Sequence, residues 1–143
     1  TIVETLDRNV LLLFMDTTVR SAFTEIENVL TQYDITALVR ENLKDDTPYI
    51  ELVIKKESLS DFVYGVTCVQ MASSRLVVDN PTFPTVDTPH TLEPICYFSD
   101  GRRGHSVKYM RKEELITDVL RQYERYVKMA SDVHHSLYLY DKE

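Results

Sequence analysis

The C-terminal part of the chain contains a long amphipathic segment, and this segment constrains the fold more than any other feature. Between Lys112 and Val127, apolar residues recur at intervals of three and four, the spacing of one face of an α-helix. The members of this stripe are Leu115, Ile116, Val119, Leu120, Tyr123, Val127 and Ala130. Such a face must be buried against another part of the chain. We expect a helix over residues 111–130, followed by a tail over residues 131–143.

The expected tail allows two structures. Leu137, Tyr138, Leu139 and Tyr140 combine large apolar and aromatic side chains in one short run. Such a run is typical of an additional strand or of a segment that docks on a partner, but a disordered terminus would have the same composition. Both alternatives remain open at this point.

A second apolar stripe lies near the N-terminus and predicts a helix over residues 9–33. Its members are Leu12, Met15, Val19, Ala22, Phe23, Ile26, Val29, Leu30 and Tyr33. Arg20, Glu25 and Glu27 fall on the opposite face, which we expect to be solvated. An alternative start would use Asp16 or Thr17 as the N-cap and leave residues 10–14 as a short strand. The unbroken spacing favours the longer helix.

The intervening residues 35–110 predict strands. Branched and aromatic runs mark strands at residues 35–39, 49–55, 61–71, 92–98 and 105–110, with a short edge strand as an option at 76–78. Residues 49–55 are apolar on both faces at their centre, so this strand is expected to be internal and to form an antiparallel hairpin with residues 61–71. Residues 92–98 and 105–110 predict a second hairpin, and Pro94 places its part of the first strand at a sheet edge. Pro81, Pro84 and Pro89 predict an irregular loop over residues 79–91.

These elements together predict a single α+β domain over residues 1–143. We expect a two-layer sandwich, with a mostly antiparallel sheet of about five strands and with both amphipathic helices on one face. A length of 143 residues suits one domain with a proper core. The chain begins at Thr1, and we expect a piece of a longer protein, although methionine removal or a tag remnant would look the same. The longest apolar run, residues 10–15, is far shorter than the ~20 residues of a membrane span, so we expect the chain itself to be soluble.

Motifs for catalysis or cofactor binding are absent from the sequence. A nucleophile elbow, a phosphate-binding loop, a dinucleotide fingerprint and paired zinc-binding cysteines are not found. The adjacent His134 and His135 would make a poor chelate, because neighbouring side chains point in different directions. We therefore predict that the protein is not an enzyme and that it has no catalytic residues, no cofactor and no metal. The net charge of −7 also argues against a nucleic-acid partner.

The two cysteines, Cys68 and Cys96, both fall in strand-like stretches. A disulfide between them is geometrically open, but we expect a reduced, buried pair of the kind found in a cytosolic compartment. Cys96 together with a histidine could form a thiolate nucleophile. Because its neighbours Ile95 and Tyr97 belong to a strand, we instead interpret Cys96 as a packing residue.

A basic cluster lies just before the C-terminal helix. Its members are Arg102, Arg103, His105, Lys108, Arg111 and Lys112, and they stand out in an acidic chain. One interpretation is a solvated turn whose charges are offset by nearby acids. The other is a contact with anionic lipid headgroups or with an acidic protein surface, to which each basic side chain near a membrane would contribute about 1 kcal/mol.

Residues 112–126 resemble the last helix of a known transporter family. In the cytoplasmic C-terminal domains of the betaine/carnitine/choline transporter (BCCT) family, and above all in its high-affinity choline transporters, this helix begins with Lys-Glu and continues with Asp-x-Leu-x-Gln-Tyr-Glu-Lys/Arg. The matching residues here are Lys112, Glu113, Asp118, Leu120, Gln122, Tyr123, Glu124 and Arg125. Weaker similarity follows the rest of the chain in order, at Phe14, Val19, Arg20 and Ala22 and at residues 49–53 and 62–66. The chain departs from the pattern at Arg111, Arg121 and Tyr126, where the family has Ser or Thr, an acid and His.

The resemblance implies a regulatory domain on the cytoplasmic face of the bacterial inner membrane, attached to a transporter of quaternary ammonium compounds such as choline and betaine. In that family the C-terminal region is associated with the control of uptake in osmotic stress. The implied partner is the membrane portion of the same transporter, and self-association is open because family members are commonly trimeric. The residues that we expect to make the regulatory contact, on the solvated side of the helix, are Asp118, Gln122, Glu124 and Arg125. The alternative is a free-standing small-molecule-binding α+β module or small enzyme, with a pocket at the apolar sheet face and the proline-rich loop.

Overall fold

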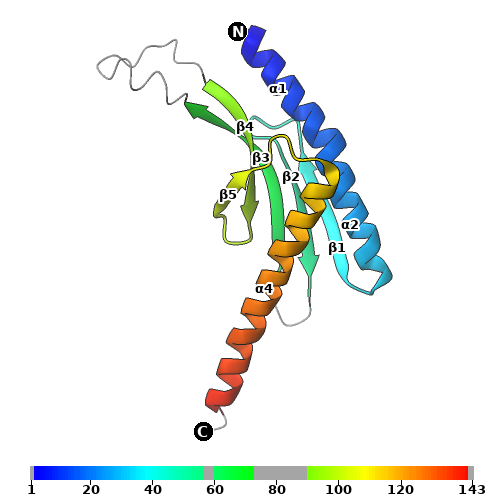
Figure 1. The fold of residues 1–143 in the computed structure, drawn as a ribbon, viewed down its shortest axis with the longest axis vertical. Coiled ribbons are helices and arrows are strands. Elements are labelled where there is room, and N and C mark those ends of the chain that lie inside the picture. The colour runs from blue at the N-terminus through cyan, green and yellow to red at the C-terminus, as the bar shows by residue number, and fades with distance from the viewer. Residues whose placement is uncertain (1, 57–59, 73–89, 142–143) are drawn as a thin grey trace, which may run out of the picture.

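The computed structural model of the protein describes residues 2–56, 60–72 and 90–141. Three successive helical segments open the chain, a sheet of five strands follows, and one long helix closes it (Figure 1). Their bounds are α1 (Ile2–Phe14), η1 (Met15–Val19), α2 (Arg20–Gln32), β1 (Thr36–Asn42), β2 (Tyr49–Lys55), β3 (Phe62–Ala72), β4 (His90–Phe98), β5 (Arg103–Ser106) and α4 (Lys112–Asp141). Among the described residues, no helix has both the length and the apolar character needed to cross a membrane.

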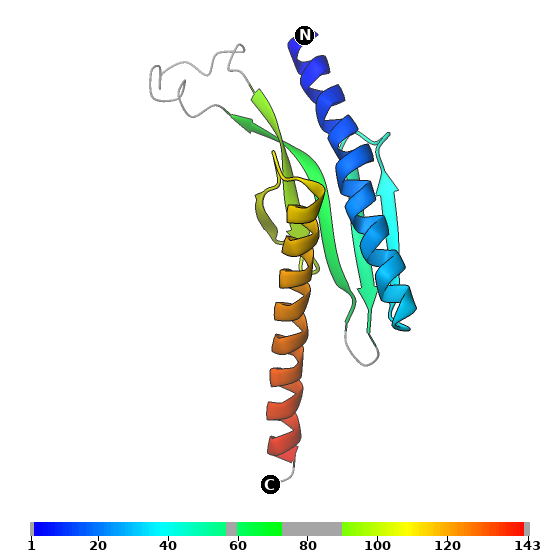
Figure 2. The ribbon, with the colours of Figure 1, turned by 45° about the vertical axis from the view of Figure 1, so that its right-hand side comes forward.

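The five strands form one antiparallel sheet in the order β1-β2-β3-β4-β5, which is also their order along the chain. The N-terminal helical run and α4 lie side by side over the same face of this sheet (Figure 2). The predicted α+β class, the two helices on one face and the antiparallel sheet are therefore confirmed. The hairpin of β2 with β3 is also confirmed, with Val53 opposite Val63 near its centre.

The core fills the space between the helices and the inner face of the sheet. It combines one stripe from each helical run with alternate residues of the central strands. Its fully enclosed members include Met15, Val19, Phe23, Ile50, Leu52, Ile54, Tyr64, Val66, Cys96, Leu115 and Val119. Phe23 and Tyr64 meet edge to face with ring centroids 6.0 Å apart. Aromatic packing thus joins α2 directly to the middle strand of the sheet.

The N-terminal helical run starts at Ile2, which is earlier than the predicted residue 9, and it contains a π-helical segment. Buried positions recur every four residues from Leu11 to Phe23. In a regular α-helix, each four-residue step overshoots a full turn by about 40°, so this row would rotate away from the sheet. The wider turn of η1, in which the backbone N–H of Arg20 donates to the Met15 carbonyl, keeps the row facing the core. The long helix is confirmed, and the alternative strand at residues 10–14 is wrong.

The second hairpin differs from the prediction in its boundaries. β5 ends at Ser106, so the predicted strand over residues 105–110 is wrong after that residue; Val107 to Met110 instead form a hydrogen-bonded turn. β4 is also not the edge strand, because β5 pairs along its outer side. Pro94 lies just beyond the last β4–β5 pair, and its carbonyl accepts a hydrogen bond from the Val107 N–H. The missing N–H of Pro94 therefore removes no hydrogen bond between paired strands, which is why an internal strand tolerates this proline.

Helix α4 continues to Asp141, so the predicted helix end at residue 130 and the separate tail over residues 131–143 are wrong. The strand alternative for the tail is wrong as well, as far as Asp141. Residues 142–143 and the predicted short strand at 76–78 lie outside the described residues, as does most of the predicted loop over 79–91; residues 90–91 belong to β4. Three residues that the periodicity assigned to the core are exposed: Val29, Tyr33 and Leu120.

Candidate functional site

A buried carboxylate lies where α4 meets the sheet. Asp118 is only 7% exposed, although the sequence pattern placed it on the solvated side of the helix; that prediction is wrong. Leu115 and Val119 place it on the inner face, because positions three and four residues apart on a helix point the same way. Its Oδ2 accepts a hydrogen bond of 2.6 Å from the hydroxyl of Tyr64, a fully buried residue of β3. A buried carboxylate requires such partners, since an unpaired one would lose its hydration without compensation.

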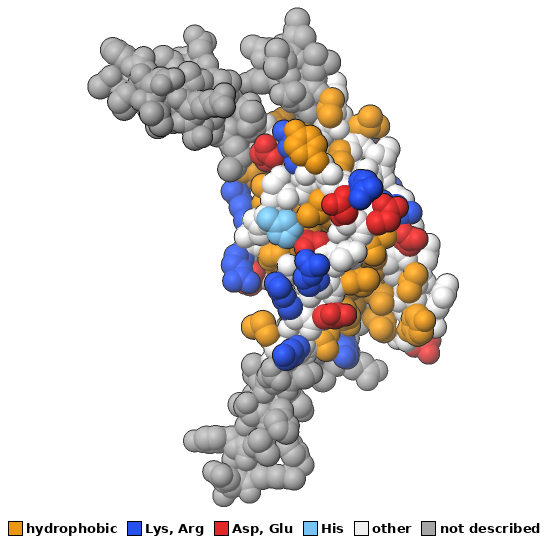
Figure 3. All heavy atoms as spheres, viewed as in Figure 1, with side chains coloured by type: hydrophobic (Ala, Val, Ile, Leu, Met, Phe, Trp, Pro, Cys, Tyr) orange, Lys and Arg blue, Asp and Glu red, His pale blue; other side chains and the backbone are white. Residues whose placement is uncertain are grey.

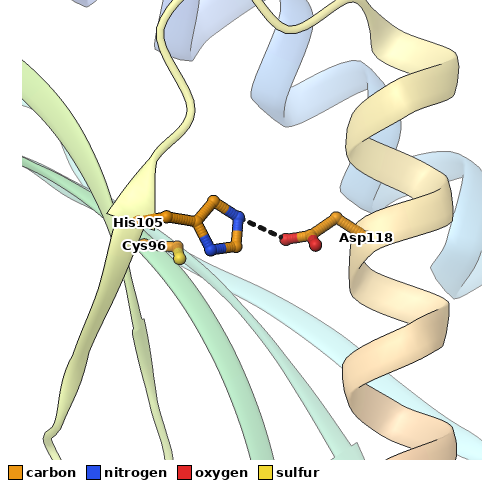
Figure 4. Close-up of side chains that lie close together, drawn as sticks. All are labelled: Cys96, His105 and Asp118. Carbon is orange, nitrogen blue, oxygen red and sulfur yellow. Dashed lines mark hydrogen bonds and ion pairs between the residues drawn. The ribbon is translucent and has the colours of Figure 1, made fainter.

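His105 approaches the same carboxylate from β5. Its Nε2 lies 2.9 Å from Asp118 Oδ2, and the imidazole remains 43% exposed. Figure 4 shows the two side chains pointing toward one another across the gap between β5 and α4. Asp118 is therefore shared by one interior partner, Tyr64, and one partner at the surface, His105.

Cys96 completes the cluster from β4. Its sulfur is fully buried and lies within 4.8 Å of ligand atoms of both His105 and Asp118 (Figure 4). The neighbouring Gly104 makes this approach possible, because a Cβ at that position would stand 2.5 Å from the sulfur. Four residues from four elements thus meet at one place: Tyr64, Cys96, His105 and Asp118.

The surroundings of the cluster keep the Tyr64 hydroxyl and the Cys96 thiol neutral. Burial raises the pKa of Tyr64 far above its ordinary value, and the hydrogen bond to Asp118 raises it further. Burial also raises the pKa of the Cys96 thiol, with partial opposition from the backbone N–H of His105 and the hydroxyl of Tyr64. A thiolate nucleophile at Cys96 is therefore disfavoured in the cluster as it stands.

A separate polar contact crosses the sheet at Tyr97. Its ring lies across Gly65, where an added Cβ would stand 2.1 Å from the ring, and its hydroxyl donates to Glu51 Oε2 at 2.7 Å. Burial raises the pKa of Tyr97 above its ordinary value, and the Glu51 carboxylate adds to the shift. The contact ties β4 to β2 across the intervening strand β3.

These raised pKa values predict loss of stability in alkaline solution. A tyrosine whose pKa is higher in the folded than in the unfolded state stabilises the fold while its hydroxyl is protonated in both states. This contribution is complete below the unfolded pKa of 10.0 and is lost as the pH rises above that pKa. Tyrosinate absorbance and circular dichroism, followed together from pH 8 to 12, check this. We expect Tyr64 and Tyr97 to ionise only as the chain unfolds. Full tyrosine ionisation in a still-folded chain would contradict the assignment.

The basic cluster runs from the β4–β5 turn through β5 to the first residue of α4, and most of its members have acidic partners. The pairs are Arg102–Asp100 (3.6 Å), His105–Asp118 (2.9 Å), Lys108–Glu93 (3.6 Å), Arg111–Glu114 (2.9 Å) and Lys112–Glu25 (3.3 Å). Arg103 is the one member without an ion pair within the described part of the chain. Figure 3 shows lysine and arginine side chains around a histidine on this face, with acidic side chains among them. The cluster is thus brought together on one surface, but much of its charge is offset locally.

The remaining motif residues of α4 lie on its outer half. Gln122 and Arg125 line a surface groove of about 510 Å³ together with Arg102 from the β4–β5 turn and Phe62 at the start of β3. Glu124 is exposed and does not line this groove. The structure therefore separates the four predicted contact residues into one core residue, two groove residues and one solvated residue.

A second groove, of about 490 Å³, lies between α2 and α4. It explains two of the incorrect core assignments, because Val29 and Leu120 line it and remain partly exposed. Lys112 and Glu25, which form an ion pair, also line this groove.

Comparison with known proteins shows that the chain is similar to part of one transporter. No protein-family model matches the chain. An uncharacterized transporter of Haemophilus influenzae is 36% identical over 133 residues, which is 92% of the chain and 20% of that protein. The chain thus corresponds to about a fifth of the length of this relative. The predicted link to a transporter is confirmed at this level.

Sequence reasoning missed the cluster around Asp118. Cys96, His105 and Asp118 follow no ligand spacing and belong to three different elements, so their convergence depends on the fold. One signal was available: Asp118 lies within the apolar stripe, between Leu115 and Val119. An acid at such a position is rarely buried without a partner, and this indicates a polar residue across the interface.

Proposed function

We propose that this chain is a regulatory domain of a BCCT-family transporter for choline- or betaine-type quaternary ammonium compounds. It lies on the cytoplasmic face of the bacterial inner membrane and adjusts uptake in osmotic stress without catalysing a reaction. The observation that carries the proposal is the 36% identity to a stretch of a bacterial transporter over almost the whole chain. The motif from Asp118 to Arg125 directs the proposal to this family.

The partner of the domain is the membrane portion of the same transporter. Gln122 and Arg125 support this assignment, because they belong to the family-like motif and yet serve no core contact: both line an open groove. Asp118 belongs to the same motif but is accounted for by its hydrogen bonds inside the fold. The regulatory contact therefore rests on the groove residues, with Glu124 beside them on the solvated side of α4. Self-association of the domain in the assembled transporter is compatible with this surface.

The proposal is tested in the full-length transporter, by measuring choline uptake against external osmolality. The double substitution Gln122→Ala with Arg125→Glu is expected to abolish or shift the osmotic activation and to leave unstressed uptake in place, because it alters the contact and not the transport pathway. Arg121→Glu is the matched control, since Arg121 is an exposed arginine of the same helix that does not line the groove. Unchanged osmotic activation on deletion of the whole domain would refute the regulatory role. Failure to take up any quaternary ammonium compound would refute the family assignment.

Anionic lipid headgroups are a second proposed contact, made by the basic cluster. Reversing the charge of Arg102, Arg103 and Arg111 is expected to weaken binding to anionic vesicles by about 1 kcal/mol per residue. The loss should be largest at Arg103, whose charge is not offset by an ion pair among the described residues. Vesicle co-sedimentation at low and at physiological salt checks this, with neutral vesicles as the control. Equal binding by the wild type and the triple variant would contradict the lipid contact.

A further inference from the structure

Three side chains of the buried cluster offer one metal-ligand atom each, and they come from three different elements. Cys96 belongs to β4, His105 to β5 and Asp118 to α4. Their ligand atoms all lie within 4.8 Å of one another. Two of the three residues, Cys96 and Asp118, are buried, which distinguishes the group from the exposed acidic clusters common on protein surfaces.

We propose that Cys96, His105 and Asp118 form a zinc site that fastens α4 to the outer strands of the sheet. The mixed set of sulfur, nitrogen and oxygen ligands suits Zn²⁺, which accepts thiolate, imidazole and carboxylate in one tetrahedral shell. The hard cations Ca²⁺ and Mg²⁺ prefer shells made of oxygen atoms alone. This site goes beyond the proposed transport role and does not depend on it. It also departs from the absence of a metal predicted from the sequence.

The three ligand atoms lie close enough together to be brought into one tetrahedral shell. Zinc lies about 2.3 Å from sulfur and about 2.0–2.2 Å from nitrogen or oxygen, so its ligand atoms are about 3.3–3.8 Å apart. His105 Nε2 and Asp118 Oδ2, now 2.9 Å apart, would separate slightly, and the sulfur would move in. Adjustments on the order of 1 Å complete the shell. On binding, the Cys96 sulfur forms a bond to the metal and its proton passes to solvent. The imidazole of His105 binds in its neutral form through the ring nitrogen that carries no proton, with its one proton on the other nitrogen.

The surroundings supply the two other features of a metal site. The Tyr64 hydroxyl donates to Asp118 and holds the carboxylate in place, as hydrogen bonds to metal ligands commonly do. The partial exposure of His105 gives an entry path for the ion and leaves the fourth position to a water molecule. The interior side of the site is closed by the core, and its open side faces solvent.

The test uses the untagged 143-residue chain, titrated with Zn²⁺ by calorimetry and with Co²⁺ by absorption spectroscopy. We expect one ion per chain, tetrahedral Co²⁺ bands, a thiolate-to-cobalt charge-transfer band and a rise in Tm on adding Zn²⁺. Cys96→Ser should remove the charge-transfer band. Tyr64→Phe, which keeps all three ligands, should weaken binding by roughly ten- to a hundredfold.

His105→Gln separates the metal site from a purely hydrogen-bonded network. A glutamine can still donate to Asp118 but is a poor zinc ligand. Because position 105 is partly exposed, we expect the variant to fold, and circular dichroism without metal verifies this. We expect a greater loss of affinity than with Tyr64→Phe. Cys68→Ser is the matched control, because this second thiol contacts Met15 and not the cluster. His134→Gln with His135→Gln controls for binding elsewhere on the chain.

Each outcome decides the proposal. Loss of tight binding in Cys96→Ser and His105→Gln, with both controls unchanged, supports the site. Zn²⁺ binding that survives in these two variants, or that disappears in the His134/His135 variant, overturns it. Failure of the wild-type chain to bind Zn²⁺ overturns it as well. The transport proposal would be untouched by any of these results, because its tests measure uptake.

Discussion

Replacing Phe23 with alanine is expected to lower the free energy of unfolding by about 3–5 kcal/mol, which would be a large part of the stability of a small domain. Phe23 is fully buried on α2 and packs edge to face against Tyr64 of β3. The substitution removes the ring, opens a cavity between helix and sheet and takes away the aromatic contact. Urea denaturation of the purified chain, followed by circular dichroism, gives the value directly.

The control for this substitution is Val29→Ala on the same helix. Val29 is 44% exposed and lies on the groove toward α4, so its truncation should change the free energy of unfolding far less. An equal loss in the two variants would mean that α2 packs on the sheet through a different face from the one described.

The second large effect is expected at the buried hydrogen bond between Tyr64 and Asp118. Asp118→Ala leaves the Tyr64 hydroxyl buried without its acceptor, at a cost of about 1–3 kcal/mol in the free energy of unfolding. Tyr64→Phe removes the donor and leaves the carboxylate with His105 alone, at a similar cost of about 1.5–3 kcal/mol. His105→Ala removes only the partly exposed partner and should cost about 0–1 kcal/mol.

A double-mutant cycle isolates this contact from the other effects of each substitution. The double variant Tyr64→Phe with Asp118→Ala should be more stable than the sum of the single losses predicts, by about 0.5–3 kcal/mol, because neither group is then left unpaired. The four proteins are compared by urea denaturation at one pH. Strict additivity would mean that the two side chains do not interact in the folded protein.

Periodicity was sufficient to predict both helices, and residue type was sufficient to predict most of the strands. The three-four spacing of Leu115 and Val119 gave the correct buried face of α4, because the side of a helix on which a residue lies depends on local spacing alone. The same spacing misplaced Leu120, which sits at the margin of the stripe and faces the groove with α2. Which marginal residues are covered depends on how two helices pack together, and this is decided by residues distant in sequence.

The cluster around Asp118 could not be predicted from residue type. Asp118 looks like a surface residue because an aspartate is seldom buried, and the compensating partner, Tyr64, lies 54 residues away on another element. The π-helical segment could not be predicted from the sequence either. A row of apolar residues spaced by four is compatible with a regular helix, and the wider turn is needed only when every member of the row must touch one flat sheet.

The order of the strands has a consequence for the way the chain is made. Each strand pairs with the strand that precedes it, so the sheet can assemble by short-range steps while the chain leaves the ribosome from its N-terminus. The last element, α4, brings Leu115, Val119 and Asp118 to a core that is otherwise already in place. Until α4 arrives, the Tyr64 hydroxyl has no carboxylate to bind and the apolar face of the sheet is only half covered. We therefore expect the nascent chain to become resistant to proteases only after the turn that follows β5 and the first turns of α4 have been synthesised.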